Sequence, residues 1–152
     1  MSFIVAPPLP EVVQEIVDSI RHQMASRCYR AANELRNAAI DVLSGQGGGR
    51  RYKIPHVGGY YTASAPGQPP AARTGIFRGG WQPAVDLAGD VFLSKIENNV
   101  STSDYPGASG RSYTLGELLE NGTSRMAPRL HHDKIKEQAE PKIVRIYEEP
   151  YF

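Results

Sequence analysis

The sequence predicts an α+β fold in which a long N-terminal helix and a C-terminal helix pack on a small antiparallel β-sheet, with a long Gly/Pro-rich loop between the first helix and the sheet. Three observations predict it. Apolar residues recur every three or four positions over residues 11–43 and again over residues 129–148, the spacing of one helix face. A short apolar run with strand character, residues 91–96, lies between them. Helices on either side of a strand region favour a sheet that helices cover on one face.

Length and charge limit the classes of protein to consider. The chain has 152 residues, so we expect residues 1–152 to form a single domain with one modest core. Lys and Arg number 17 against 16 Asp and Glu, a balance that is unusual for a protein that binds nucleic acid over its whole surface. We expect no membrane-spanning helix and no signal peptide. The single cysteine, Cys28, excludes an internal disulfide and a cysteine-based zinc site.

Residues 11–43, which follow an N-terminal tail of residues 1–10, are predicted to form one helix. Pro10 suits a first helical turn, where its missing N–H costs nothing. At about 1.5 Å per residue the helix would be roughly 50 Å long, more than one small domain can cover. We therefore expect a neighbouring subunit to bury part of its apolar stripe. The alternative is a helix that breaks or bends near residues 25–26.

The segment 45–73 is predicted to be a Gly/Pro-rich arm that is poorly ordered or projecting in the free subunit. Ten of the 15 glycines and four prolines fall within residues 45–80. Such a composition buries too little apolar surface to order itself. No acidic residue occurs between Asp41 and Asp86, so the local field is positive. The basic residues in this interval are Arg50, Arg51, Lys53, Arg73 and Arg78.

Residues 74–128 are predicted to supply the sheet and its loops. Residues 76–85 have strand character that glycines and a proline weaken, and residues 91–96 form the better strand. We place a turn at residues 89–90 and a polar loop at residues 101–110.

Two helical segments follow the sheet. Residues 113–119 fit either a strand or a short helix, and the Thr114–Glu117 pair, which has the spacing of a capping box, favours the helix. The last helix is predicted over residues 129–148, with Pro141 removing one backbone hydrogen bond and introducing a kink.

No pattern of residues typical of an enzyme is present, and we expect no catalytic residue, no cofactor and no metal. The Gly-rich tract 45–51 lacks the Gly-Lys-Ser/Thr ending of a phosphate-binding loop. His131 and His132 would lie about 100° apart on a helix and share no face. We therefore expect both to be exposed at the start of the helix. Cys28 lies on the apolar stripe and is expected to be a small core residue.

Two motifs separated by about forty residues resemble the neck or tail-completion proteins of long-tailed bacteriophages. The first, residues 64–76, is a proline-rich lead that ends in Arg-Thr-Gly-Ile. The second, residues 113–129, contains a Tyr, then Glu-Asn-Gly-Thr, a Met and Pro-Arg. The resemblance extends over residues 64–140. It departs from the family at Asn121, where an aromatic residue is common, and at 130–131, where proline and an aromatic or aliphatic residue are usual. The residues that carry it are Pro66, Gly67, Pro69, Pro70, Arg73, Thr74, Gly75, Tyr113, Glu120, Gly122, Thr123, Met126 and Arg129.

The resemblance implies a structural virion protein without catalytic turnover. It implies a homo-oligomeric ring, hexameric to match the tail, that joins the tail to the DNA-filled head after assembly in the host bacterial cytoplasm. The implied partners are other copies of the chain, connector or stopper proteins, and tail-tube or tail-terminator proteins. Non-specific contact with passing DNA is also implied. The alternative is a small nucleic-acid-binding protein that acts through the basic segment 50–78, where Tyr52, Tyr60 and Tyr61 alternate with basic residues.

Some of these residues have physical roles that do not depend on the resemblance. Gly75 and Gly122 suit positions of positive φ or close backbone approach. Thr74 and Thr123 could accept hydrogen bonds from adjacent amides.

The two motif arginines, Arg73 and Arg129, could pair with Glu120, bind carbonyls across an interface, or remain solvated, because a guanidinium group offers a rigid fork of donors.

Overall fold

The computed structural model describes residues 9–89, 91–105, 108 and 110–152. Most of the predicted N-terminal tail, one residue of the predicted 89–90 turn and part of the polar loop lie outside the described residues. The elements are α1 (Leu9–Val42), β1 (Arg51–Lys53), β2 (Tyr60–Thr62), α2 (Ile76–Gly79), β3 (Trp81–Ala88), β4 (Val91–Asn98), a 3-10 turn (Thr102–Asp104), α3 (Leu115–Asn121) and α4 (His132–Tyr147).

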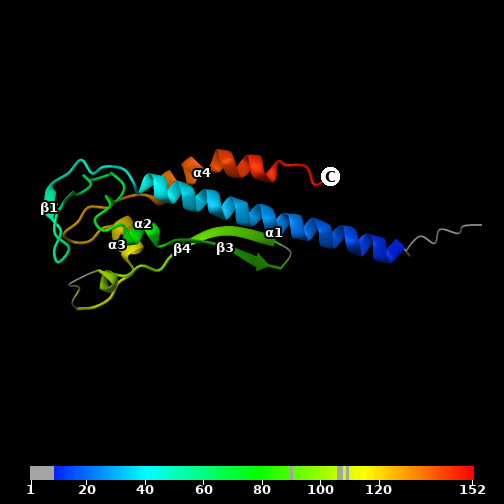
Figure 1. Ribbon diagram of the computed structural model, residues 1–152, viewed down its shortest axis with the longest axis horizontal. Coiled ribbons are helices and arrows are strands. Elements are labelled where there is room, and N and C mark those ends of the chain that lie inside the picture. The colour runs from blue at the N-terminus through cyan, green and yellow to red at the C-terminus, as the bar shows by residue number, and fades with distance from the viewer. Residues whose placement is uncertain (1–8, 90, 106–107, 109) are drawn as a thin grey trace, which may run out of the picture.

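The chain has the expected α+β architecture, with α1 as its central element. Figure 1 shows α4 along one side of α1 and the β3–β4 hairpin along the other. The described strands form two antiparallel pairs, β1 with β2 and β3 with β4. The sheet region therefore consists of two small hairpins, of which β3–β4 is the one that packs on α1.

Helix α1 is continuous through residues 25–26, so the alternative of a helix that breaks there is wrong. Its length of 34 residues corresponds to roughly 51 Å. No helix in the described part of the chain is long and apolar enough to cross a membrane. The buried face of α1 and of the turn after it consists mainly of small residues: Cys28, Ala31, Ala32, Ala38, Ala39 and Leu43.

The hydrophobic core lies where the C-terminal half of α1 meets α4 and the start of β3. Phe77 and Trp81 pack against each other edge to face, with ring centroids 5.8 Å apart. From α4, Ile135 and Ala139 complete the core, and Ala139 is fully buried. Ala39 of α1 and Ala139 of α4 both belong to this core, and small residues at a helix contact allow the backbones to approach closely.

The prediction of one strand over residues 76–85 was wrong in its first half, where α2 replaces it. Gly75, at a φ of 82°, precedes the helical turn. That turn brings Phe77 and Trp81, four residues apart, to the same side of the chain, where both are buried. Burial of two large aromatic rings outweighs the modest strand propensity of the segment.

The β3–β4 hairpin confirms the predicted strand at 91–96 and extends it to Asn98. The register runs from Trp81 opposite Asn98 to Ala88 opposite Val91. Pro83 is tolerated because each strand of a two-stranded sheet has an unpaired edge. The Asn98 side-chain amide donates to the Phe77 carbonyl oxygen over 2.8 Å, which ties the end of the hairpin to α2.

Both later segments are helical, as predicted, with changes at their ends. Thr114 precedes α3 without a side-chain capping bond, so the predicted capping box does not form. The Leu115 amide instead donates to the Val100 carbonyl oxygen over 2.9 Å. Helix α4 begins at His132, three residues later than predicted, and continues through Pro141.

The arm is more ordered than its composition suggested. Residues 51–53 and 60–62 pair as the short hairpin β1–β2 at one end of the molecule (Figure 1). At its base, Gly47 and Gly49 lie against the backbone of Ala63 and Ser64. A Cβ atom on Gly47 would stand 2.3 Å from the Ala63 carbonyl oxygen. These glycines therefore permit close packing, whereas we had expected them to provide flexibility.

Replacement of Ala39 by Leu tests the close approach of α1 and α4. Ala39 is fully buried, so we expect the added volume to lower the free energy of unfolding by about 1–3 kcal/mol. Asn37→Leu, at an exposed position of the same helix, is the control and should change stability by less than about 0.5 kcal/mol. Urea denaturation measures both. Equal effects of the two substitutions would contradict the packing described.

Candidate functional site

The two sequence motifs meet at one cavity beside the C-terminal end of α1. The cavity has a volume of about 550 Å³. The first motif contributes Pro70, Arg73 and Gly75 to its lining, and the second contributes Met126 and Arg129. The remaining motif residues do not line it: Pro66, Gly67, Pro69, Thr74, Tyr113, Glu120, Gly122 and Thr123.

Apolar side chains from four parts of the chain form most of the cavity wall. Leu43 comes from the end of α1, Phe77 from α2 and Leu119 from α3. Tyr61 and Pro55 come from the arm, so the arm closes one side of the cavity. The site depends on the arm being folded as the structure shows.

Three arginines give the cavity a positive charge, because none of the described residues that line it is acidic. They are Arg73, Arg78 and Arg129. Arg73 Nε and Arg129 Nη1 are buried and have no hydrogen-bond partner among the residues that the structure describes. Unused buried donors of this kind are costly, and an anionic group would satisfy them.

Tyr105 adds a neutral donor to the same wall. The Arg73 guanidinium carbon lies 5.8 Å from the centroid of its ring. Burial raises the pKa of the Tyr105 phenol above its ordinary value. The hydroxyl therefore stays protonated at neutral pH and can donate a hydrogen bond.

The two motif glycines have the positive φ angles that we predicted, 82° at Gly75 and 73° at Gly122. At Gly122 a Cβ atom would also stand 2.7 Å from the Met126 carbonyl oxygen. Thr74 and Thr123 accept hydrogen bonds from the amide two residues further on, over 3.5 and 3.2 Å. These four residues shape the turns that carry the cavity wall.

Glu120 pairs with histidines, not with the motif arginines that we had considered as its partners. Its Oε2 atom accepts from the His131 backbone amide over 3.0 Å and lies 2.8 Å from His131 Nδ1. Its Oε1 atom lies 3.8 Å from His132 Nδ1. His131 Nδ1 is also 2.9 Å from the Arg129 carbonyl oxygen.

His131 is fully buried, which corrects the prediction that both histidines are exposed. It precedes α4 with φ −137° and ψ −24°, so the 100° helical spacing does not apply, and the two imidazole centroids lie 4.6 Å apart. Its ring packs edge to face on Phe77 and Trp81. Burial lowers the pKa of His131 and keeps its ring neutral. An aromatic or aliphatic residue is usual here in the family that the sequence resembles, which was the available signal for burial.

Replacement of Glu120 by Ala tests the bond between α3 and α4. Its side chain is only 19% exposed and its partner His131 is buried. The variant would leave the His131 amide without an acceptor, so we expect a loss of about 1–3 kcal/mol. This exceeds the cost of at most about 1 kcal/mol expected for an exposed ion pair. Glu117→Ala, at an exposed position of α3, is the control for thermal unfolding. Identical melting temperatures for the two variants would refute the role of Glu120.

Comparisons with known proteins add no assignment: no protein-family model, no curated protein and no solved structure matches this chain.

Proposed function

We propose that the protein is a structural component of the head–tail connection of a long-tailed bacteriophage. In this proposal it closes into a hexameric ring in the neck of the virion, between connector or stopper proteins and tail-tube or tail-terminator proteins. The two motifs on which the resemblance rests support the proposal, because they contribute to one cavity although they are distant in sequence. The protein would act by binding and ordering its partners, without catalytic turnover.

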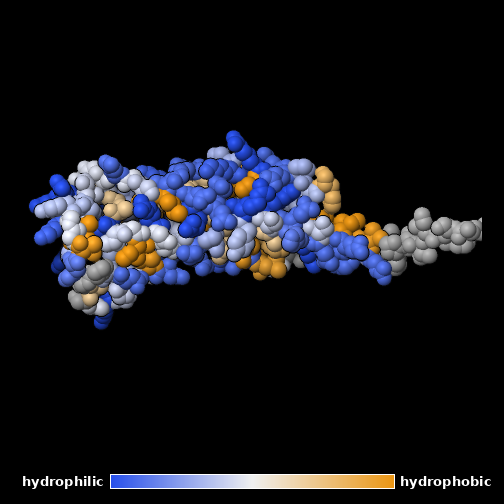
Figure 2. Space-filling view, viewed as in Figure 1, coloured by the Kyte–Doolittle hydropathy of each residue, from blue (hydrophilic) through white to orange (hydrophobic). Residues whose placement is uncertain are grey.

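The observation that carries the ring proposal is the uncovered N-terminal part of α1. Figure 1 shows α1 running on beyond the ends of α4 and of the β3–β4 hairpin. Val13 and Ile16 on this part are 52% and 45% exposed. Leu87 and Val91, at the tip of the hairpin, are also exposed, and Figure 2 shows apolar surface in this region. A helix end with uncovered apolar residues suits a contact with another protein surface.

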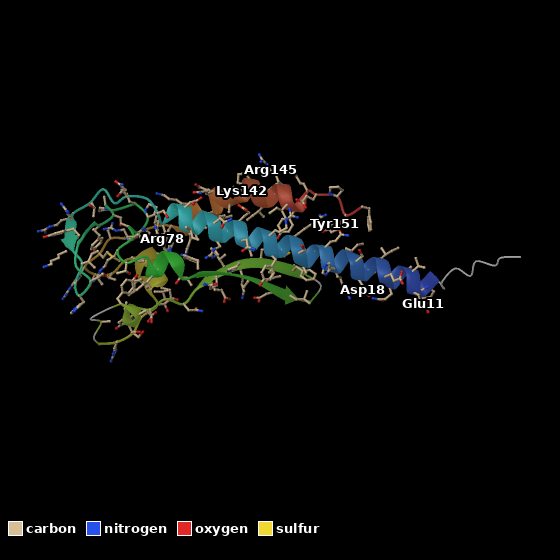
Figure 3. All side chains as sticks on the ribbon, in the orientation of Figure 1. Glu11, Asp18, Arg78, Lys142, Arg145 and Tyr151 are labelled. Atoms are coloured by element: carbon tan, nitrogen blue, oxygen red, sulfur yellow. The ribbon has the colours of Figure 1, made fainter. Side chains whose placement is uncertain are left out.

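The two ends of the molecule carry opposite charge. The exposed part of α1 bears Glu11, Glu15 and Asp18 and no basic residue before Arg21. The opposite end carries the arginines of the cavity. Figure 3 shows Glu11 and Asp18 far from Arg78 along the long axis. Opposite charges at the two ends favour contact between the acidic end of one copy and the basic end of the next.

A closed ring requires such a heterologous contact, in which two different surfaces of the same chain meet. The acidic and apolar end of α1 would dock at the basic cavity of the neighbouring copy. Carboxylates of this end would pair with the positive charge of the cavity arginines, and Val13 and Ile16 would reach apolar wall residues. Charge attraction sets the orientation, and apolar burial provides most of the binding free energy.

Replacement of both Val13 and Ile16 by Lys tests this contact, because it removes the apolar side chains and adds charges that the basic cavity repels. Both residues are exposed, so we expect thermal stability to be unchanged while self-association at high concentration is lost. Val144→Lys is the control, because Val144 is an exposed apolar residue on α4, away from the tip of α1. Light scattering measures the mass of each sample, alone and with isolated tail tubes.

Two results would contradict the ring proposal. One is a wild-type protein that stays monomeric both alone and in the presence of tail tubes. The other is a double variant that assembles as the wild type does.

The β1–β2 hairpin supports nucleic-acid binding as a second candidate function. Tyr52 and Tyr61 stack with ring centroids 5.9 Å apart. The Arg51 guanidinium lies 4.6 Å from the centroid of the Tyr60 ring. Both Tyr52 and Tyr60 are exposed beside basic residues, an arrangement that suits stacking on bases and contact with phosphates.

The dependence of DNA affinity on salt tests the second function. If the hairpin binds DNA, affinity should fall steeply with salt, and replacing both Arg51 and Lys53 by Ala should reduce the slope of log K against log salt by about 2. Arg145→Ala, at an exposed position of α4, is the control and should not change the slope. A salt slope that the double variant leaves unchanged would count against the hairpin as a DNA contact.

A further inference from the structure

We infer that Glu120, His131 and His132 form a zinc-binding site that fastens α3 to the start of α4. One ligand atom from each residue lies within 4.8 Å of the others. Imidazole nitrogen and carboxylate oxygen are ligands that Zn²⁺ takes readily, whereas Mg²⁺ and Ca²⁺ favour oxygen alone. The site lies outside the cavity and does not depend on ring assembly.

The spacing of the ligand atoms fits a tetrahedral ion. Ligand atoms at about 2.0–2.1 Å from a tetrahedral zinc are separated by roughly 3.3 Å. Glu120 Oε2 lies 2.8 Å from His131 Nδ1, and Glu120 Oε1 lies 3.8 Å from His132 Nδ1. These two distances involve different oxygens of the Glu120 carboxylate, and with one ligand atom from each residue all separations lie within 4.8 Å. Side-chain movements that shorten these separations toward roughly 3.3 Å would bring the three ligands to zinc.

The backbone at the start of α4 makes the convergence possible. His131 has non-helical φ and ψ angles, and His132 is the first residue of the helix. The two side chains therefore leave the chain in directions that a continuous helix would not allow, and their ring centroids stand only 4.6 Å apart. The hydrogen bond from the His131 amide to Glu120 holds the carboxylate beside both rings.

Burial is graded across the three ligands. The His131 side chain is fully buried, Glu120 is 19% exposed and His132 is 55% exposed. The buried side fixes two ligands rigidly, and the exposed side provides an entry path and a fourth position for water. The ion pairs that the structure describes for Glu120 are with these two imidazoles. A divalent cation held between the three side chains would balance the charge of the Glu120 carboxylate.

Zinc at this position would also act on the cavity wall. The Arg129 carbonyl oxygen is 2.9 Å from His131 Nδ1, and the Arg129 side chain lines the cavity. When Nδ1 binds zinc, it no longer donates to this carbonyl oxygen, and the ring proton resides on Nε2, which is buried and has no hydrogen-bond partner among the described residues. Zinc binding would thus free the Arg129 carbonyl oxygen from His131.

The test uses the full chain after a chelator has removed any bound metal. One titration adds ZnCl₂ and measures binding by calorimetry. A second adds Co²⁺ and measures visible absorption. We expect one zinc ion per chain, the absorption of tetrahedral Co²⁺, and a higher melting temperature with zinc. His132→Ala and Glu120→Gln should each weaken binding by about tenfold or more. His22→Ala and His56→Ala replace the two exposed histidines outside the cluster and should bind as the wild type does.

Circular dichroism checks that each variant is folded, so that a loss of zinc binding can be attributed to the lost ligand. His132 is half-exposed, and its replacement should leave the fold intact. Glu120→Gln retains an acceptor for the His131 amide while it removes the charge. The absence of saturable zinc binding by the wild-type chain would overturn the inference. So would zinc binding that survives both substitutions in the cluster, or that is lost with His22 or His56.

Discussion

The alanine-rich face of α1 is the constraint on which the rest of the structure depends. Ala31, Ala32, Ala38 and Ala39 are almost fully buried, and no larger side chain could occupy these positions without separating the elements that pack there. With small residues at the contact, α4 approaches one side of α1 and the β3–β4 hairpin approaches the other. A single helix therefore serves as the common support for both layers (Figure 1).

Polar contacts fix the position of each layer along this support. The Arg36 side chain donates to the Trp81 carbonyl oxygen over 3.1 Å, which sets the start of β3 against α1. Near the other end of α4, Arg27 donates to the Pro150 carbonyl oxygen over 2.7 Å, and its guanidinium carbon lies 3.8 Å from the Tyr151 ring centroid. These contacts hold both layers toward the C-terminal part of α1. The N-terminal part of the helix is left uncovered as a consequence, and the cavity forms at the opposite end.

Local patterns in the sequence predicted those elements whose residues interact with near neighbours. Helix α1, strand β4 and helix α4 follow from apolar spacing alone. Helix α2 was missed because glycines interrupt both the helical and the strand pattern of apolar residues. The four-residue separation of Phe77 and Trp81 was nevertheless a helical signal. The role of Gly47 could not be predicted, because its close contact is with Ala63, sixteen positions away. His131 was misplaced because helical geometry was applied to a residue that lies just before the helix.

The two motifs could be recognised in the sequence. That both contribute residues to one cavity could not be predicted from it. Arg73 and Arg129 come together only because α2 and α3 both pack at the end of α1. The sequence offered Arg73 and Arg129 as possible partners of Glu120, whereas the structure pairs it with His131. Such long-range pairings depend on how the helices pack, which local composition does not determine.

The central claim, an asymmetric contact between the acidic end of α1 and the basic cavity, is tested most directly by mixing two defective chains. One carries Val13→Lys and Ile16→Lys and retains its cavity. The other carries Arg73→Glu and Arg78→Glu and retains its α1 end. Light scattering should find each variant monomeric alone, and their mixture should form 1:1 dimers that grow no further. A mixture that stays monomeric, or a cavity variant that dimerises by itself through α1, would contradict the account.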